Sequence, residues 1–179
     1  MTDSFKNQFL VALPTLSGDY FQNSITLIVD HNADGAFGLM INRPLDQDLR
    51  AVFPDLPDHI HCPLLEGGPV ERDQIFFLHR GDRNFESTYA ISDDLSLTTS
   101  RDLVDLLHDG DMPEPIVAIL GYAGWAANQL ETELGENTWL LTPANADIVF
   151  EVPAEQRASA AAKQLGVDIN LIAPRAGHD

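Results

Sequence analysis

A Gly-Gly-Pro sequence between two apolar segments constrains the fold of this chain more than any other feature. Residues 64–66 (Leu-Leu-Glu) precede Gly67-Gly68-Pro69, and the apolar run 75–78 follows after a short charged stretch. Glycine permits backbone conformations and close approaches that a side chain forbids, and proline fixes φ and removes an amide donor. We therefore expect an unusual connection between two buried strands, with the Glu66 carboxylate at its mouth. At least one of the two glycines should have a positive φ or lie where a Cβ atom would clash.

The first half of the chain has the pattern of β-strands. Apolar and β-branched residues predominate in short runs separated by turn residues, which is typical of strands joined by hairpins. Residues 32–35 (Asn-Ala-Asp-Gly) supply a hairpin loop between two such runs. Asp46 or Asp48 can cap a short helix over Leu49 to Phe53. The predicted strands are 9–13, 25–31, 36–42, 64–66, 75–79, 87–91 and 95–97.

The second half switches to helical periodicity. Leu103, Val104, Leu106 and Leu107 share one helical face after a cap at Thr99, and residues 116–120 predict a central strand. We expect Gly121-Tyr122-Ala123-Gly124-Trp125 to turn that strand into a helix. Further predictions are a strand at 139–141, helices at 144–150 (capped by Thr142) and 153–165, and a last strand at 167–172. The fold class is therefore α+β, with a mixed, mostly antiparallel sheet or open barrel flanked by helices.

Length and charge restrict the organisation and the partners. At 179 residues the chain suits one domain, placed at 1–174 with a polar tail at 175–179. Ten basic against 28 acidic residues give a net charge of −18, and acids concentrate between Asp93 and Glu114. Such a surface repels nucleic-acid phosphates and anionic membranes, so we expect no direct binding to either. The single cysteine and the lack of a signal peptide or membrane-length apolar run predict a cytoplasmic protein.

Several motifs in order resemble a known family. They are Asp30-His31-Asn32, the run Gly35-Ala36-Phe37-Gly38-Leu39-Met40-Ile41-Asn42-Arg43-Pro44, Glu66-Gly67-Gly68-Pro69-Val70, Leu78-His79, and Gly121-Tyr122-Ala123-Gly124-Trp125 with Gln129-Leu130-Glu131. Together they are similar to the bacterial AlgH/YqgE family over essentially the whole chain. The resemblance implies an α+β fold around a mixed, barrel-like sheet. One member of that family is named as a transcriptional regulator of alginate synthesis, and the resemblance carries no catalytic residues over to this chain.

Two possible ligand sites have only weak support in the sequence. His59, His61 and Cys62 offer zinc ligands within four positions, but the prolines around them and the missing second ligand pair favour an exposed polar loop, so we predict no metal. Gly121 and Gly124 follow a strand as phosphate-binding glycines do, yet no Lys-Ser/Thr pair or third glycine follows. We therefore expect close packing there and no nucleotide or other cofactor.

Acid–base chemistry is the other alternative. Glu66 could meet His31 or His79 if their strands are neighbours, but polar residues at strand ends more often satisfy loop backbone. There is no Gly-x-Ser-x-Gly sequence that would supply an acyl-transfer nucleophile. Arg72, Arg80 and Arg83 alternate with acidic residues, which favours surface ion pairs over an anion site.

The predicted functional surface combines three turns that contain glycine or proline. We expect them to converge and to present Arg43 and Glu66 as opposite charges. The candidate ligand-site residues are Asn42, Arg43, Glu66, Gly67, Gly68, Gly121, Tyr122, Gly124 and Trp125. We predict a regulatory or interaction protein that contacts an unidentified protein partner without binding DNA directly. The alternative is a small-molecule-binding protein or enzyme with a site at the Gly67-Gly68-Pro69 and Gly121–Trp125 turns, and a DNA-binding regulator is disfavoured by charge.

Overall fold

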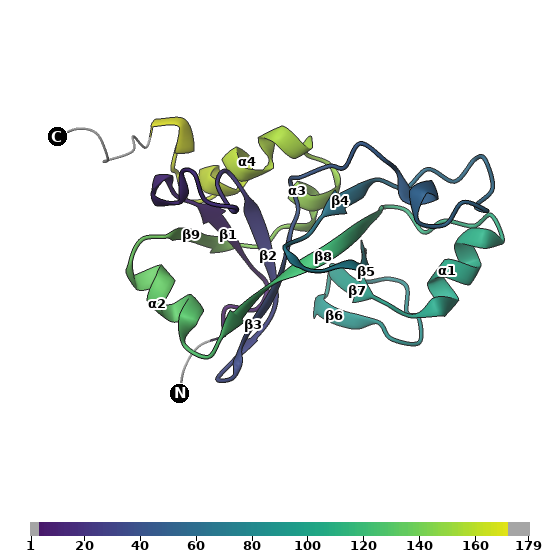
Figure 1. Cartoon of the computed structure of the whole chain (residues 1–179), viewed down its shortest axis with the longest axis horizontal. Coiled ribbons are helices and arrows are strands. Elements are labelled where there is room, and N and C mark those ends of the chain that lie inside the picture. Colours follow the sequence, from purple (N-terminus) through teal and green to yellow (C-terminus); the bar gives the residue numbers. More distant parts are fainter. Residues whose placement is uncertain (1–3, 172–179) are drawn as a thin grey trace.

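Nine strands form a curled, mostly antiparallel half-barrel in the computed structural model, which describes residues 4–171 (Figure 1). The strand order is β6-β7-β5-β8-β3-β2-β1-β9, and β4 pairs with β8 beside this path. The predicted α+β class is therefore confirmed. The strands are β1 (Gln8–Ala12), β2 (Ile25–Asn32), β3 (Gly35–Met40), β4 (Leu64–Glu66), β5 (Val70–His79), β6 (Tyr89–Ser92), β7 (Leu95–Thr98), β8 (Ile116–Ala126) and β9 (Trp139–Pro143). The helices are α1 (Arg101–His108), α2 (Gln129–Gly135), α3 (Ala146–Phe150) and α4 (Arg157–Lys163).

Strand β8 connects the two halves of the molecule. Its first part pairs with β5 antiparallel and with β4 parallel, and its second part pairs with β3. Figure 1 shows it running diagonally from the half that contains α1 to the half that contains α2. At the change of partners stands Gly121, whose φ of +78° is a conformation that favours glycine.

The predicted turn at residues 121–125 is wrong. The backbone continues as a strand, with Ala123 opposite Gly38 and Trp125 opposite Ala36. The glycines allow a local irregularity and close strand contact, as in a β-bulge, rather than a reversal of direction. The following helix, α2, begins only at Gln129, after Asn128 with a left-handed φ of 66°.

The hairpin of β2 and β3 is confirmed, with an irregularity in register between Ile28 and Asp30. Strand β1 lies between β2 and β9 and is almost wholly buried. Its alternate side chains face two different apolar clusters: Phe9 and Val11 pack on the side of α3 and α4, and Leu10 and Ala12 on the side of α2. This strand therefore needs the continuous apolar sequence from which it was predicted.

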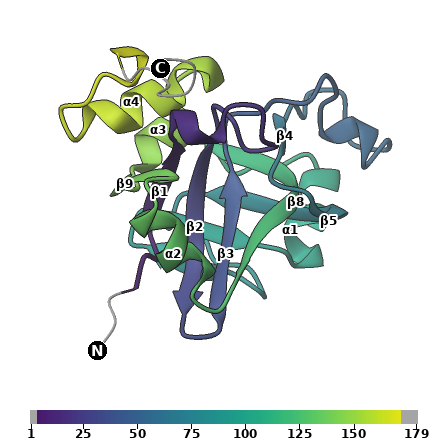
Figure 2. The same cartoon turned by 60° about the vertical axis from the view of Figure 1, so that its left-hand side comes forward.

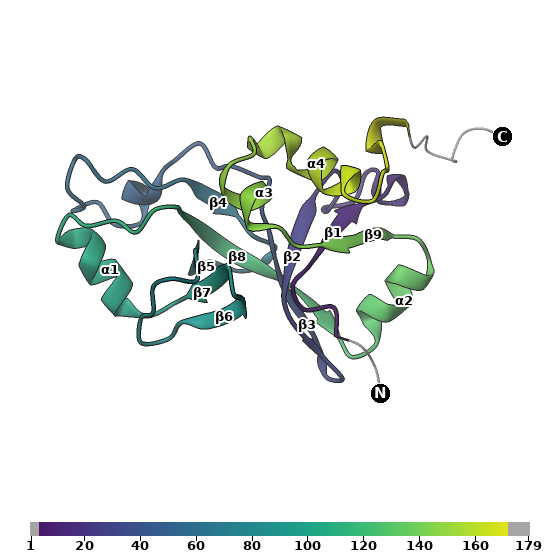
Figure 3. The ribbon, with the colours of Figure 1, turned by 180° about the vertical axis from the view of Figure 1, so that it is seen from behind.

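Helices cover the sheet at three places. Figures 2 and 3 show α2 beside β9 and the end of β8, and α3 and α4 along β1 and β9. Helix α1 packs with the 49–64 segment on the first part of β8 and on β5. One carboxylate attaches α2 to the sheet, because Glu133 accepts the indole N–H groups of Trp125 at 3.0 Å and Trp139 at 2.8 Å.

Helix boundaries differ from the sequence prediction at two caps. Ser100, not Thr99, occupies the cap position of α1. Thr142 and Pro143 continue β9 as far as the pair Gln8–Pro143, and the cap of α3 is Asn145, whose side chain accepts the amide of Asp147 at 2.9 Å. Side-chain capping of a backbone amide is present at α3, whereas the hydroxyl of Ser100 makes no capping bond and donates to the carboxylate of Asp102.

The chain beyond α4 is not the predicted strand. Residues 169–171 form a 3₁₀ turn, in which Asp168 accepts the amide of Asn170 through its carboxylate at 3.0 Å. The alternating apolar pattern of 167–172 predicts a strand, but this local Asx bond competes with a β-ladder. Residue 172 and the tail at 175–179 lie outside the described residues. Between residues 4 and 171, no helix has the length and apolar character needed to cross a membrane.

The close contact at Gly68 generates a stability prediction. A Cβ atom there would lie 2.1 Å from the main chain of Tyr122, whereas one on Gly124 would meet only a ring carbon at 3.7 Å. We expect Gly68→Ala to lower the free energy of unfolding by more than about 1 kcal/mol, because backbone must move, and Gly124→Ala to change it by less than about 0.5 kcal/mol. Urea denaturation of both variants measures this, and equal midpoints would refute the steric argument.

Candidate functional site

Three segments distant in sequence meet where β8 changes partners. The amide of Gly67 donates to Leu120 at 2.7 Å, and its carbonyl accepts the amide of Met40 at 2.8 Å. The amide of Glu66 donates to the carbonyl of Arg43 at 2.9 Å. Two of the three predicted turns, 42–44 and 66–68, therefore lie side by side, and the 66–68 turn lies against β8.

The two glycines make this approach possible. Neither has a positive φ, but a Cβ on Gly67 would lie 2.4 Å from the carbonyl oxygen of Gly121. Together with the contact of Gly68, this confirms the expectation that a side chain would clash here. The glycines therefore serve close backbone packing.

Tyr20 joins the two charged residues of the predicted site. Its hydroxyl donates to a carboxylate oxygen of Glu66, and the Arg43 guanidinium lies 4.9 Å from the centre of its ring. Arg43 also donates to the carbonyls of Tyr20 and Gln22, the latter at 3.1 Å. The guanidinium of Arg72 lies 5.9 Å from the same ring. Burial, followed by the hydrogen bond and charge of Glu66, raises the pKa of Tyr20 to about 12. At neutral pH the phenol is therefore a fixed hydrogen-bond donor.

Asn42 lies beside this cluster at the edge of a cleft. Its carbonyl oxygen accepts the amide of Ile25 at 3.2 Å, and its amide group donates to the carbonyl of Asn23 at 2.9 Å. The cleft has a volume of about 410 Å³ and lies between the 13–23 segment and α4. It is lined by Ala12, Leu13, Pro14, Ser17, Gln22, Asn23, Asn42, Glu155, Ala158, Ser159, Ile169 and Asn170.

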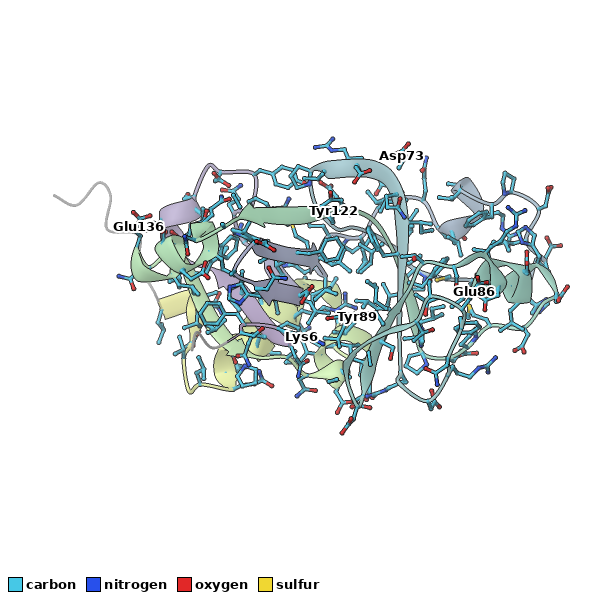
Figure 4. The ribbon with its side chains drawn as sticks, turned by 90° about the horizontal axis from the view of Figure 1, so that it is seen from below. Lys6, Asp73, Glu86, Tyr89, Tyr122 and Glu136 are labelled. Atoms are coloured by element: carbon cyan, nitrogen blue, oxygen red, sulfur yellow. The ribbon has the colours of Figure 1, made fainter. Side chains whose placement is uncertain are left out.

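The third predicted turn does not contribute its side chains. Tyr122 packs against Phe37 with ring centres 4.8 Å apart, and its hydroxyl donates to Glu71 at 3.0 Å. Figure 4 shows Tyr122 on β8 in the view from below, where Lys6 and Tyr89 also lie close together. Trp125 is buried beneath α2 and Gly124 carries no side chain. Only the backbone of this segment, at Gly121 and Tyr122, reaches the crossing.

The acid–base alternative is not formed. Glu66 is bonded to Tyr20, not to a histidine. The buried ring of His31 bonds to the amide of Phe5 at 3.0 Å and to Glu131 at 2.9 Å. His79 is bonded to the carbonyl of Arg80 and to Thr98, each at 2.7 Å, and burial lowers its pKa. Both imidazoles thus hold structure together and are not directed at a site.

The loop with three possible zinc ligands has no such convergence. His59 bonds to the carbonyl of Gly110 at 2.8 Å, and the thiol of Cys62 is buried and donates to the carbonyl of Pro63. Among residues 4–171, no three histidine, cysteine or acidic side chains are grouped to hold a metal ion. Burial raises the pKa of the Cys62 thiol to about 12, which opposes both metal binding and nucleophilic attack.

Of the three arginines predicted to pair with their acidic neighbours, Arg80 and Arg83 form ion pairs, but with acids from other elements, and within residues 4–171 Arg72 forms none. Arg80 contacts Asp94 and Asp147 at 2.8 Å and Glu151 at 3.3 Å. Arg83 lies 4.0 Å from Asp111. The acids come from the turn between β6 and β7, from α3 and from the segment after α1, so local alternation of charge did not identify them.

Sequence reasoning missed Tyr20, Gln22 and Asn23, and the contribution of α4 to the cleft. The turn residues at 17–24 marked this segment as irregular, which is where functional side chains concentrate. The tyrosine in this segment was the one sequence signal for a functional side chain there. No local pattern indicates that Ser159 and Asn170 lie across the cleft from this segment.

Comparison with known proteins gives full-length similarity. A family described as AlgH-like matches residues 9–170. A UPF0301 protein of Nitrosococcus oceani is 43% identical, covering 97% of this chain and 96% of the relative, and one of Pseudomonas fluorescens is 41% identical over 97% and 95%. The solution structure of AlgH from Pseudomonas aeruginosa has a TM-score of 0.80 at 38% identity and covers both chains fully. A crystal structure of a Corynebacterium diphtheriae protein shares the fold, with a TM-score of 0.76 at 18% identity over 96% of this chain and 92% of that one.

The Tyr20 phenol predicts a loss of stability at alkaline pH. The folded protein holds this proton up to a pKa of about 12, whereas an unfolded tyrosine releases it near 10. The stabilisation is therefore complete below about pH 10 and disappears as pH rises towards 12. We expect Tyr20→Phe to cost about 1 kcal/mol at pH 8. Its deficit should shrink at about pH 11, as measured by urea denaturation, and a deficit that is constant with pH would contradict this prediction.

Burial of Cys62 predicts an unreactive thiol. With 2% of its surface exposed and a pKa of about 12, the thiol should not react with iodoacetamide at about pH 8 in the native protein. The same reagent should alkylate it completely in denaturing urea, as followed by mass spectrometry. Rapid alkylation of the native protein would instead indicate an accessible, reactive cysteine.

Proposed function

The chain belongs to the AlgH-like family, and we propose that it is a cytoplasmic regulatory protein that acts through contacts with other proteins and does not bind DNA directly. The observation that carries this proposal is how the chain uses its few basic side chains. A DNA-binding surface needs exposed cations that can displace counterions from phosphates. In this protein, several arginine side chains instead bond to main-chain carbonyls or acidic side chains of the same chain.

Three arginines bond to main-chain carbonyls. Arg43 holds the 20–22 segment, as described above. Arg50 donates to Pro57 at 3.1 Å and to Ile60 at 3.0 Å, which ties down the loop before β4. Arg157 donates to the carbonyls of Val152, at 2.9 Å, and Ile41. With Arg80 surrounded by three acids, these residues leave little positive charge to face a phosphate backbone.

The acidic face along α1 supports a basic protein surface as the partner. We define it by Asp105 on the helix and by Asp109 and Asp111 just after it, all of which are exposed. Beside it, Phe53 and Val104 line a shallow depression of about 500 Å³. Two of these acids are paired at the limit of ion-pair distance, Asp111 with Arg83 at 4.0 Å and Asp105 with Arg101 at 3.9 Å. An apolar centre next to an excess of acidic charge is a combination that protein interfaces use, with the charge steering association.

The enzymatic alternative has less support. Acyl transfer requires a nucleophile within hydrogen-bond reach of a base. Within the described residues, Cys62 is buried and has no hydrogen bond to a histidine, and His31 and His79 are both engaged in structural bonds.

The proposal is tested with a charge-neutralised variant and a matched control. In the acidic-face variant, Asp105→Asn, Asp109→Asn and Asp111→Asn remove three charges; in the control, Asp34→Asn, Asp73→Asn and Glu136→Gln remove three exposed charges elsewhere. After cross-linking in cells, the acidic-face variant should lose the proteins recovered with the native chain, and the control should keep them. The native protein should not shift duplex DNA at about 50 mM salt, where non-specific binders are strongest.

Two results would overturn the proposal. Salt-sensitive retardation of DNA by the native protein would contradict the exclusion of DNA. Equal recovery of partners by both variants would contradict the assignment of the acidic face.

A further inference from the structure

We infer that the cleft between the 13–23 segment and α4 binds a small polar molecule that is neutral or positively charged. This inference does not rest on the proposed function, because it concerns a different surface from the acidic face of α1. It assigns a ligand class to a part of the molecule that includes one residue of the predicted site, Asn42. Three properties of the cleft carry it: size, rigidity and chemistry.

The size of the cleft suits a small molecule. Its volume of about 410 Å³ falls within the roughly 300–1,000 Å³ of ligand sites in proteins. The 13–23 segment forms one wall, and residues of α4 and of the 3₁₀ turn at 169–171 form the other. Figure 2 shows α4 across the end of β1, beside the segment that follows this strand. Ala12 and Asn42 join the two walls.

The first wall is held in place by side chains. Asn42 bonds to Asn23, and Arg43 bonds to Gln22, so both lining residues are fixed through their own carbonyls. Within the wall, Gln22 accepts the amide of Gly18 at 2.7 Å, and Thr15 donates to the carbonyl of Asn137 at 3.3 Å. These bonds restrain an otherwise irregular segment.

The second wall is attached to the same sheet. Arg157, at the start of α4, donates to the carbonyl of Ile41, the residue before Asn42. Further along the helix, the hydroxyl of Thr142 in β9 donates to the carbonyl of Ala161 at 3.3 Å. Both walls are therefore positioned before a ligand arrives, which reduces the entropic cost of binding.

The chemistry of the lining selects against anions. The amides of Asn23 and Asn170 and the hydroxyls of Ser17 and Ser159 offer both donors and acceptors, beside apolar carbons of Leu13, Pro14, Ala158 and Ile169. The amides of Gln22 and Asn42 also line the cleft but already bond within the fold. Among residues 4–171, the lining contains a carboxylate, Glu155, and no lysine, arginine or histidine. Phosphates and carboxylates would meet negative charge without a cation to compensate. Hydroxyl- or amine-bearing molecules would find partners.

Several of these polar groups are available. Within residues 4–171, the side chains of Asn23, Ser159 and Asn170 make no hydrogen bond to another residue, although neighbouring polar side chains of the fold do. Amide groups can donate and accept at once, which suits the paired hydroxyls of sugars and the edges of nucleobases. A ligand bound here would replace water on both walls.

The experiment compares neutral probes with their phosphorylated counterparts. The full chain is titrated with glucose and glucose 6-phosphate, with adenosine and AMP, and with putrescine as the cation, and thermal unfolding and amide NMR shifts are recorded. We expect at least one neutral or cationic probe to raise the melting temperature and to shift amides of the 13–23 segment and α4. Its phosphorylated counterpart should bind at least about tenfold more weakly.

Two tryptophan variants, one on α4 and one just before it, locate the site. Ser159→Trp places a bulky side chain in the cleft, and Gln156→Trp places the same side chain at an exposed position in the 3₁₀ turn that precedes α4, outside the lining. Ser159→Trp should weaken binding by more than about tenfold and Gln156→Trp should not change it. Asn170→Ala, a milder change, should weaken it about fivefold, as expected for one hydrogen bond.

The inference is overturned by any of three results. They are no response to any of the five probes, equal binding of the phosphorylated counterparts, or unchanged binding by Ser159→Trp and Asn170→Ala. Melting temperatures of the ligand-free variants show whether each remains folded, and Asn170→Ala decides the outcome if Ser159→Trp does not fold.

Discussion

The structure depends on one close approach of backbone to backbone. Gly67 and Gly68 lie against Gly121 and Tyr122 at distances that exclude a Cβ atom, at the point where β8 exchanges β4 and β5 for β3. The two parts of the sheet, one before Gly121 and one after it, are joined through β8. The glycine contact lies at this junction. The segment around Arg43 is bonded to Glu66 and so takes its place from the same contact. Arg43 in turn donates to the carbonyls of Tyr20 and Gln22, which connects one wall of the cleft to this contact.

Short-range patterns predicted most of this fold because they report burial. The apolar runs of β1, β2, β3 and β5 predict strands correctly, because a buried strand needs a continuous or alternating apolar sequence. The error at 121–125 has a physical reason: glycine marks a turn and a bulge alike, and only the partner strand decides between them. At 167–171 the reason is different: the carboxylate of Asp168 bonds to the amide of Asn170, a local bond that competes with pairing in a sheet.

The site was predictable only in part because its contacts are long-range. The meeting of the 42–44 and 66–68 turns was inferred correctly, as both end strands of one sheet. Tyr20 stands 46 residues from the Glu66 that it contacts, and Arg157 stands 116 residues from Ile41. The chain has 10 basic residues, and a count of charges does not reveal that several arginines bond to main-chain carbonyls. These bonds hold irregular loops in place within a strongly acidic protein.

The shared carboxylate of Glu133 has a consequence for spectroscopy. Trp125 and Trp139 are the two tryptophans of the chain, and both donate to the same oxygen beneath α2, with ring centres 6.2 Å apart. Their emission therefore reports on one end of the molecule and is silent about α1 and its surroundings. A loss of fluorescence on denaturation would register the detachment of α2, so a change confined to the opposite end would need circular dichroism or NMR to be seen at all.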